Sequence, residues 1–372
     1  MTTWRLLFVD DDVEICKSFA EHIELEPLDE EDGFELRTLS DFSSALGTLE
    51  SEPFDLLILD VRLGPFDGDP DEEAGTLTLE TIRNRRFIPV IFYTGLPGKV
   101  SHLTSQLIRV VEKTEGFGRL IEEAREVIST KLPSVNRAIM RHVEEVQRVY
   151  MWDFVAKHWA EIAETPDKTA LAYLLARRLA MSLSQTGIDE FIRQIGGEIR
   201  TSYADSMIHA MQYYIMPPVG PTPMAGDIYA DHLESEVTYS VVLTPSCDFA
   251  QNKAERVLLA RASLLSDQKE YKDWLDDTKN EGKLKSLLKN SRQGMPSDRY
   301  HFLPSALDIP GLILDFQDTY TISLTALTPL KRLASLDSPF AEALLSRFVR
   351  YMGRLGTPDL NVVEIVQTLR QS

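Results

Sequence analysis

The sequence predicts an α/β fold at its amino end, namely a doubly wound, five-stranded parallel sheet of the flavodoxin-like type. A helical middle region and a small β-rich, barrel-like α+β domain are expected to follow. Short apolar runs alternate with amphipathic stretches of helix length in the first 130 residues, and the middle has apolar residues at spacings of three and four. The last third returns to strand-like runs. Alternation of strands and helices is typical of a parallel sheet with helices on both faces.

Five apolar runs in the first region have the length of buried strands. They are Trp4–Val9, Phe34–Leu39, Phe54–Leu59, Phe87–Tyr93 and Ile108–Val111. Helices are expected between and after them, including Val13–Leu25, Phe42–Leu49 and Gly118–Ile128. In such a sheet, ligands bind at the carboxyl ends of the strands. The residues that follow the strands are therefore the first candidates for a functional site.

Those strand ends carry a consistent set of polar groups. Asp10 and Asp11 follow the first strand, Asp60 the third, Thr94 the fourth and Lys113 the fifth. A single aspartate at a strand end is more often a turn or cap residue, but here four strand ends agree. Carboxylates packed together repel one another unless a cation neutralises them, and the hard ion Mg²⁺ suits such a site. The pattern predicts a magnesium site at which a carboxylate accepts a phosphoryl group.

The same segments resemble the receiver domains of two-component signalling. The matching pieces are Leu6-Leu-Phe-Val-Asp-Asp-Asp12, Asp55-Leu-Leu-Ile-Leu-Asp60, Pro89-Val-Ile-Phe-Tyr-Thr94 and Val110-Val-Glu-Lys113. The resemblance covers about a third of the chain. It implies a phosphorylation-dependent response regulator, whose phosphoryl donor is a histidine kinase or a phosphotransfer protein.

The resemblance also implies a role for each residue at the metal site. Asp60 would be the phosphoacceptor, and Asp10 and Asp11 would be the acidic pair that holds Mg²⁺ together with Asp60. Arg62 would lend its backbone carbonyl to the metal. The acidic insert 67–73 lengthens the loop beside this site and is expected to be a solvated loop.

The resemblance implies two further roles, which concern the switch. Thr94 would bond the phosphoryl group through its hydroxyl, and Lys113 would pair with it. Val110 stands where the family often has Tyr or Phe. We therefore expect phosphorylation to be read out through Thr94 in a different way from that of the family, or to be constitutively bypassed. A receiver catalyses only its own phosphorylation and usually its own dephosphorylation, so no further enzyme activity is implied.

Charge and cysteine content exclude several classes of function. Residues 1–130 hold 28 Asp and Glu against 12 Lys and Arg, whereas the remainder holds 30 against 27. An acidic first region repels a phosphate backbone, so nucleic-acid binding is not expected there. Cys16 and Cys247 form no CxxC pair, which excludes a disulfide framework and a thiolate zinc site. No run approaches the roughly 18 apolar residues of a membrane span, and we expect a cytoplasmic protein.

The middle region, residues 131–216, is expected to be a helical linker or domain. One long helix has an apolar face made of Ile139, Val143, Val146, Tyr150 and Phe154. Further helices are expected at Lys168–Ser184, Ile188–Ile195 and Glu198–Ile215. The apolar face fits packing within its own domain better than the seam of a homodimer, which stays an alternative. Leu175–Ile188 matches a helix-turn-helix weakly, so a DNA-binding output is a less favoured alternative.

Residues 224–372 are expected to form the β-rich output domain. Its strands are expected at Gly226–Tyr229, Val237–Leu243, Arg256–Ala260, Gly311–Phe316 and Tyr320–Leu324. Helices are expected in an insertion around Asp267–Lys289 and at Phe340–Met352. The pieces Gly226-Asp-Ile and Val241-Val-Leu-Thr-Pro loosely resemble the small barrels of toxin-type ribonucleases, and this similarity is too short to assign an activity.

One chemical motif stands out in this output domain. Cys247 lies beside Asp248 and would be a nucleophile if His209, His232 or His301 served as its base. A buried cysteine next to a turn-capping aspartate is the favoured interpretation, because a neighbouring carboxylate raises a thiol pKa. We therefore expect an output by protein–protein interaction with a partner that the sequence does not identify. A receiver-controlled enzyme, either a hydrolase or a ribonuclease, is the alternative.

Overall fold

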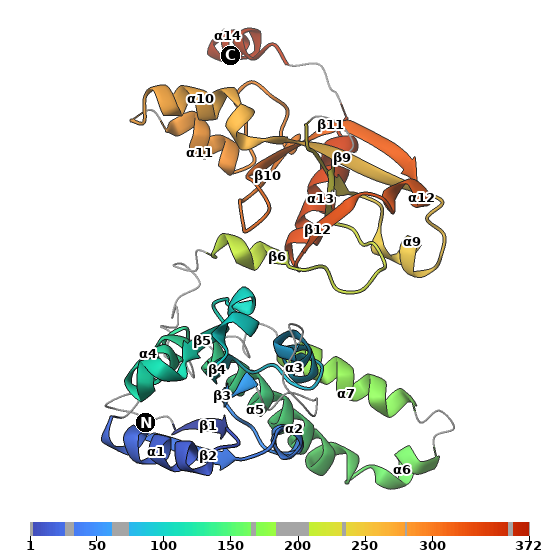
Figure 1. The fold of residues 1–372 in the computed structure, drawn as a ribbon. Coiled ribbons are helices and arrows are strands. Elements are labelled where there is room, and N and C mark those ends of the chain that lie inside the picture. Colours follow the sequence, from blue (N-terminus) through green and yellow to red (C-terminus); the bar gives the residue numbers. More distant parts are fainter. Residues whose placement is uncertain are drawn as a thin grey trace. The chain divides into compact units, whose positions relative to one another are not determined.

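The structure is a computed structural model that describes residues 3–26, 33–61, 74–164, 169–183, 208–232, 236–279, 281–355 and 360–371. The chain divides into two compact units, residues 1–203 and 204–372 (Figure 1). The finer division into domains 1–130, 131–216 and 224–372 stays a prediction. Among the described helices, none has the length and apolar character needed to cross a membrane.

The first unit contains a parallel sheet with the strand order β2-β1-β3-β4-β5. The strands are β1 (Thr3–Val9), β2 (Gly33–Leu39), β3 (Leu56–Leu59), β4 (Val90–Thr94) and β5 (Ile108–Glu112). All four neighbouring pairs are parallel. This order is that of the flavodoxin-like doubly wound fold, so the predicted fold class is confirmed. Each predicted strand is present, with ends shifted by up to three residues.

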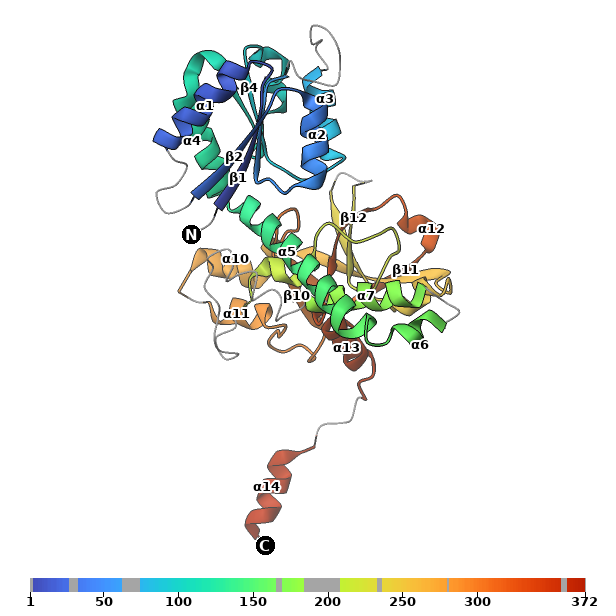
Figure 2. The same cartoon turned by 90° about the horizontal axis from the view of Figure 1, so that it is seen from below.

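Helices cover both faces of this sheet (Figure 2). One face carries α1 (Val13–Leu25) and α4 (Gly116–Ser129), and the other carries α2 (Phe42–Ser51) and α3 (Ala74–Arg83). The inner strands β1, β3 and β4 are mostly buried between these helices, and this is why they appear in the sequence as nearly continuous apolar runs.

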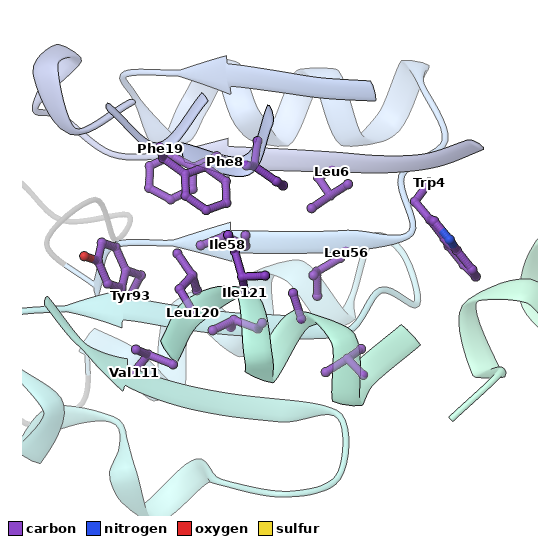
Figure 3. Packing of buried hydrophobic residues seen from close by; sticks show 14 of the residues in the cluster. Trp4, Leu6, Phe8, Phe19, Leu56, Ile58, Tyr93, Val111, Leu120 and Ile121 are labelled. Atoms are coloured by element: carbon purple, nitrogen blue, oxygen red, sulfur yellow. The ribbon is translucent and has the colours of Figure 1, made fainter. Parts of the chain in front are cut away.

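The two layers of core follow from the alternation of side chains along a strand. On β1, Leu6 and Phe8 point to the layer of α1 and α4, whereas Leu7 and Val9 point to the layer of α2 and α3. Phe8 stacks on Phe19 of α1 with ring centroids 4.6 Å apart. Figure 3 shows this first layer, in which side chains of β1 and β3 meet those of α4.

The connection between β4 and β5 contains no α-helix. It holds two short 3₁₀ turns, η2 (Pro97–Lys99) and η3 (Ser101–Leu103), with Val100 fully buried between them. Leu96 and Leu103 pack partly buried against the same layer of core as α2 and α3. Irregular backbone therefore covers this part of the sheet, where a doubly wound fold usually has a helix.

Beyond the sheet, the first unit continues as a helical hairpin. Its helices are α5 (Leu132–Tyr150), a π-helical turn (Met151–Val155), α6 (Trp159–Glu164) and α7 (Thr169–Ser182). The helices α5 and α7 are antiparallel, because His142 contacts Ser182 (Nε2 to Oγ, 2.9 Å) and Tyr150 lies under the guanidinium of Arg178. The prediction of a helical middle is confirmed as far as residue 183.

The other predicted helices of the middle region are not borne out in the same way. Ile188–Ile195 lies outside the described residues. The helix predicted over Glu198–Ile215 is wrong at its described end, where a 3₁₀ turn, η6 (Ala210–Tyr213), leads into β6 (Tyr214–Ile215). Residues 214–215 are not helical because they form β6, which pairs with the last strand of the second unit, β12 (Lys331–Leu336).

A cluster of polar contacts attaches α5 to the amino end of the sheet. The guanidinium of Arg137 donates hydrogen bonds to the Asp55 carboxylate, at 3.0 Å from Nε to Oδ1, and to the carbonyl of Thr3, at 2.9 Å. It also lies 5.3 Å from the ring centroid of Trp4. Because Asp55 is buried, loss of this cation would leave an uncompensated charge, at a cost of about 3–5 kcal/mol.

The second unit is built on a curled antiparallel sheet with the order β10-β11-β9-β8-β7-β12-β6. Its strands after β6 are β7 (Asp227–Asp231), β8 (Thr238–Val242), β9 (Arg256–Leu264), β10 (Tyr300–Leu303), β11 (Leu312–Ser323) and β12 (Lys331–Leu336). The helices are α9 (Ser246–Ala250), α10 (Lys269–Asp276), α11 (Gly282–Leu288), α12 (Leu324–Leu327), α13 (Phe340–Met352) and α14 (Val362–Gln371). The predicted β-rich α+β domain is thus confirmed.

Two details of this sheet differ from the prediction. The runs Gly311–Phe316 and Tyr320–Leu324 belong to one strand, β11, whose pairing with β9 shifts register between Leu314 and Thr319. The strands β10 and β12 were not predicted. The main core of the unit lies under α13, where Leu344 packs among the buried residues of the sheet.

Candidate functional site

Three charged side chains meet at the carboxyl edge of the parallel sheet. The ammonium nitrogen of Lys113 lies 2.7 Å from Oδ2 of Asp10 and 2.8 Å from Oδ2 of Asp60. The side chains of Asp10 and Asp60 are almost fully buried, with 1% and 2% of their surface exposed. Two buried carboxylates therefore share one cation.

The strand order explains why these residues meet. The strands β1 and β3 are neighbours, and their pairing continues past β3, since the amide of Asp60 donates to the carbonyl of Val9 at 3.0 Å. On the other side of β1, the amide of Asp10 donates to the carbonyl of Leu39 at 3.1 Å. Backbone hydrogen bonds thus hold the two aspartates side by side, and Lys113 reaches them from the end of β5.

The three consecutive aspartates after β1 have different environments. Carboxylate oxygens of Asp10, Asp11 and Asp60 all lie within 4.8 Å of one another, with Asp11 exposed. The next residue, Asp12, instead caps α1, since its Oδ1 accepts a hydrogen bond from the amide of Glu14 at 2.9 Å. Three carboxylates outweigh the single charge of Lys113, and their hard oxygen donors fit Mg²⁺. Asp10, Asp11 and Asp60 are therefore the residues that could hold this metal.

Burial and ion pairing have opposite effects on the pKa values of Asp10 and Lys113. Burial raises the pKa of the Asp10 carboxyl above its ordinary value, against the opposing effect of Lys113. Burial also acts to lower the pKa of Lys113, but pairing with Asp10 and Asp60 outweighs it and the pKa of the ammonium is raised. Lys113 therefore stays charged at neutral pH and remains the fixed cation of the site.

Thr94 lies at the end of β4, at the same edge, and is fully buried. Its hydroxyl oxygen accepts a hydrogen bond from the amide of Leu96 at 3.1 Å, where the connection through η2 and η3 begins. The neighbouring hydroxyl of Tyr93 donates to the carbonyl of Lys113 at 3.4 Å. Sequence reasoning missed Tyr93, although its place one residue before Thr94 puts it at the same strand end. Both β4 residues are thus linked to segments that flank the acidic group.

Arg62 and the acidic insert 67–73 lie outside the described residues. The predicted role of the Arg62 carbonyl as a metal ligand stays a prediction, as does the solvated character of the insert.

In the part of the second unit that the structure describes, Cys247 is not paired with a base. Cys247 is exposed, and its sulfur lies 3.8 Å from Oδ1 of Asp248. Within the described ranges, no hydrogen bond or ion pair joins Cys247 to His209, His232 or His301. The prediction that Cys247 is buried is wrong, since its thiol lies on the surface at the start of the short helix α9.

The three histidines have other environments. His209 accepts a hydrogen bond from the amide of Met211 at 3.2 Å and so caps η6. His232 is exposed. His301 is buried on β10, and neither ring nitrogen has a hydrogen-bond partner among the residues that the structure describes.

The Gly226-Asp-Ile piece has a structural explanation. Gly226 has φ +86°, and a Cβ at this position would lie 3.0 Å from the Cβ of Leu336, so only glycine fits. Asp227 is fully buried and accepts hydrogen bonds from Ser335 at 2.6 Å and from Arg332 at 2.9 Å. This piece therefore joins β7 to β12, and its similarity to small barrels assigns no activity.

No protein-family model matches the sequence, and no curated protein matches it either. Among solved structures, the chain is similar to a response regulator receiver domain protein (CheY-like) from Methanospirillum hungatei JF-1, with 21% identity, 35% of this chain and 96% of that chain covered, and a TM-score of 0.28. It is also similar to full-length FixJ from B. japonicum, with 18% identity, coverage of 53% and 98%, and a TM-score of 0.29. It is also similar to the RcsB response regulator of Salmonella typhimurium, with 17% identity, 52% of this chain and 96% of that chain covered, and a TM-score of 0.28.

We expect Asp11→Asn to weaken Mg²⁺ binding by roughly tenfold or more, because one of three converging carboxylates is lost. Asp12→Asn removes the same charge one residue further along and should leave Mg²⁺ affinity nearly unchanged, since asparagine caps a helix as well as aspartate does. Isothermal titration of the full chain with Mg²⁺ measures both. An equal loss of affinity in the two variants would mean that Mg²⁺ responds only to the general negative charge.

The buried His301 should make the second unit less stable in mild acid. Burial, aided by the positive charge of Arg347, lowers the pKa of His301 from 6.5 to about 4. Between these values the unfolded chain binds a proton that the folded chain does not. Stability is therefore full above pH 6.5 and falls by about 3 kcal/mol as the pH drops to about 4.

Urea unfolding at several pH values, followed by hydrogen exchange of peptides from residues 300–352, measures this loss. His301→Leu should remove most of the pH dependence between 6.5 and 4. If the wild type and His301→Leu lose the same stability between pH 6.5 and 4, groups other than His301 cause the loss.

Proposed function

We propose that the protein is a cytoplasmic response regulator of a two-component system. Asp60 accepts a phosphoryl group from a histidine kinase or a phosphotransfer protein, and the output is a protein–protein interaction. The observation that carries the proposal is the contact of one ammonium, that of Lys113, with the buried carboxylates of Asp10 and Asp60 at the carboxyl edge of the sheet.

The proposed reaction transfers a phosphoryl group from a histidine imidazole of the donor to the carboxylate of Asp60. A carboxylate oxygen of Asp60 attacks the phosphorus of the phosphohistidine, the new O–P bond forms, and the N–P bond breaks with the electron pair leaving on the imidazole. Lys113, already in contact with Asp60, pairs with the phosphoryl oxygens as they arrive. Asp10, Asp11 and Asp60, together with the backbone carbonyl of Arg62, would hold the cation. When bound, Mg²⁺ supplies the positive charge that neutralises the phosphoryl oxygens.

Thr94 provides the proposed readout. Its hydroxyl oxygen accepts a hydrogen bond from the amide of Leu96, and its hydroxyl proton can be donated to a phosphoryl oxygen on Asp60, which is a charged and therefore strong acceptor. Turning of Thr94 toward the phosphoryl group would release the Leu96 amide and with it the start of the η2 and η3 connection. Since Val110 carries no aromatic ring to rotate, we propose that this connection reports phosphorylation.

A binding output is favoured over an enzymatic one by the surroundings of Cys247. An acidic neighbour at 3.8 Å and the lack of a contacting histidine in the described part of the chain do not favour a thiolate nucleophile. Cys247→Ser should therefore leave the output unchanged if it is binding, and would abolish it in a thiol enzyme. Nothing specific favours the DNA-binding alternative.

We expect the wild type to gain one phosphoryl group on incubation with acetyl phosphate and Mg²⁺, and Asp60→Asn to gain none, because the acceptor carboxylate is gone. Asp12→Asn is the matched control and should be phosphorylated like the wild type. Intact-mass analysis of the full chain measures the adduct. Equal labelling of Asp60→Asn and the wild type would show that Asp60 is not the acceptor.

Absence of an adduct in a folded wild type would be followed by incubation with a phosphorylated phosphotransfer protein. Absence with both donors would contradict the proposal.

A further inference from the structure

A cavity open to solvent lies between α10 and α11 of the second unit, two helices that lie side by side in Figure 1. Its walls come from these helices and from residues 291–293, in the turn that leads to β10. The cavity has a volume of about 550 Å³, and small-molecule sites have volumes of roughly 300–1,000 Å³. The function proposed for Asp60 makes no use of it.

Buried contacts fix the walls of this cavity. The guanidinium of Arg292 donates to both carboxylate oxygens of Glu270 on α10, at 2.8 and 2.9 Å, and lies 4.5 Å from the ring centroid of Tyr300 on β10. Leu287 of α11 is fully buried against Tyr300 and Ile313. The two helices and the turn are thus held together without a ligand, so little ordering opposes the binding of one.

The charges that line the cavity do not cancel. The ion pair of Arg292 with Glu270 leaves Lys269, Lys283 and Asp273 as the remaining charged lining residues. Within the described ranges, none of these three side chains forms an ion pair or a hydrogen bond. Two ammonium groups against one carboxylate leave a net positive charge, which attracts an anion.

The uncharged lining residues offer hydrogen bonds to that anion. Ser286 and Ser291 carry hydroxyl groups and Gln293 carries an amide, and these side chains have no hydrogen-bond partner among the described residues. A phosphate monoester presents charged oxygens, which are strong acceptors for ammonium and hydroxyl donors. The donors in the cavity therefore suit a phosphate group.

The same lining indicates what the phosphate is attached to. Apart from Gly282, every described residue of the lining is charged or carries a hydroxyl group or an amide. A nucleobase or an acyl chain would find no apolar or aromatic side chain to pack on there. A sugar, with a hydroxyl group on most of its carbons, finds a hydrogen-bonding partner on each wall.

We propose that this cavity binds a small sugar phosphate. The ammonium groups of Lys269 and Lys283 bind the phosphate, whereas Asp273 and Gln293 bind hydroxyl groups of the sugar. A nucleic-acid backbone is a less suitable source of phosphate, because residues 204–372 hold 21 Asp and Glu against 17 Lys and Arg. Binding here does not require phosphorylation, so this proposal holds or fails separately from the function proposed for Asp60.

Isothermal titration of the full chain with glucose 6-phosphate tests the proposal. Mg²⁺ is left out, so that the acidic site of the first unit does not attract the phosphate. We expect a dissociation constant below about 1 mM. Lys269→Gln and Lys283→Gln should each weaken binding by about tenfold, since each removes a charge-assisted hydrogen bond. Lys272→Gln is the matched control, because it removes an exposed charge of α10 outside the cavity and should bind like the wild type.

Two further ligands test the two parts of the molecule. Glucose lacks the phosphate and should not bind measurably. Inorganic phosphate lacks the sugar hydroxyl groups and should bind at least about tenfold more weakly than glucose 6-phosphate. Hydrogen exchange of the full chain with glucose 6-phosphate should show protection in peptides from residues 268–294.

Four results would overturn the proposal. Glucose 6-phosphate that does not bind up to about 10 mM would exclude a site for this ligand class. An equal loss of affinity in Lys272→Gln and Lys283→Gln would show that binding follows only the general surface charge. Inorganic phosphate that binds as tightly as glucose 6-phosphate would leave a simple anion site, and tighter binding of adenosine monophosphate would assign the cavity to a nucleotide.

Discussion

The contact of one lysine ammonium with two buried aspartates is the interaction on which the first unit depends. Each charge removed from water costs several kcal/mol unless a partner compensates it, so Asp10, Asp60 and Lys113 tolerate burial only together. They follow β1, β3 and β5, whose carboxyl ends share one edge of the parallel sheet, and the neighbouring positions of β1 and β3 place the two aspartates within reach of one lysine. The strand order therefore allows the two buried carboxylates to be compensated by the ammonium of Lys113.

The strand β3 is held by a cation at each end. Asp60 follows it and contacts Lys113, whereas Asp55 precedes it and contacts Arg137 of α5. The helix that leads out of the sheet is thus attached to the strand that carries the proposed acceptor. The site also touches the irregular connection between β4 and β5 through Thr94 and Leu96. In the proposed function, a phosphoryl group on Asp60 would act on the rest of the unit by two routes, one through the strand β3 and one through the hydrogen-bonded loop after Thr94.

The sequence predicts the parallel sheet and the residues at its edge because strands buried on both faces appear as continuous apolar runs that end in polar residues. It does not predict the contact of Arg137 with Asp55, since the two are 82 residues apart and each resembles an ordinary surface charge. In the second unit, β11 is predicted as two strands because its register shifts after Leu314. The helix predicted up to Ile215 fails because pairing with β12 outweighs local periodicity. Exposure of Cys247 depends on the turn after β8, which the apolar pattern does not specify.

The most direct measurement of the central claim is the chemical identity of the phosphorylated residue. Reduction of the acyl phosphate with borohydride converts the modified aspartate to homoserine, and peptide mass mapping then locates it. We predict homoserine at position 60 alone, formed only when the chain was phosphorylated in the presence of Mg²⁺. Homoserine at position 10 or 11, or at no position in a folded chain exposed to a competent phosphoryl donor, would contradict the account.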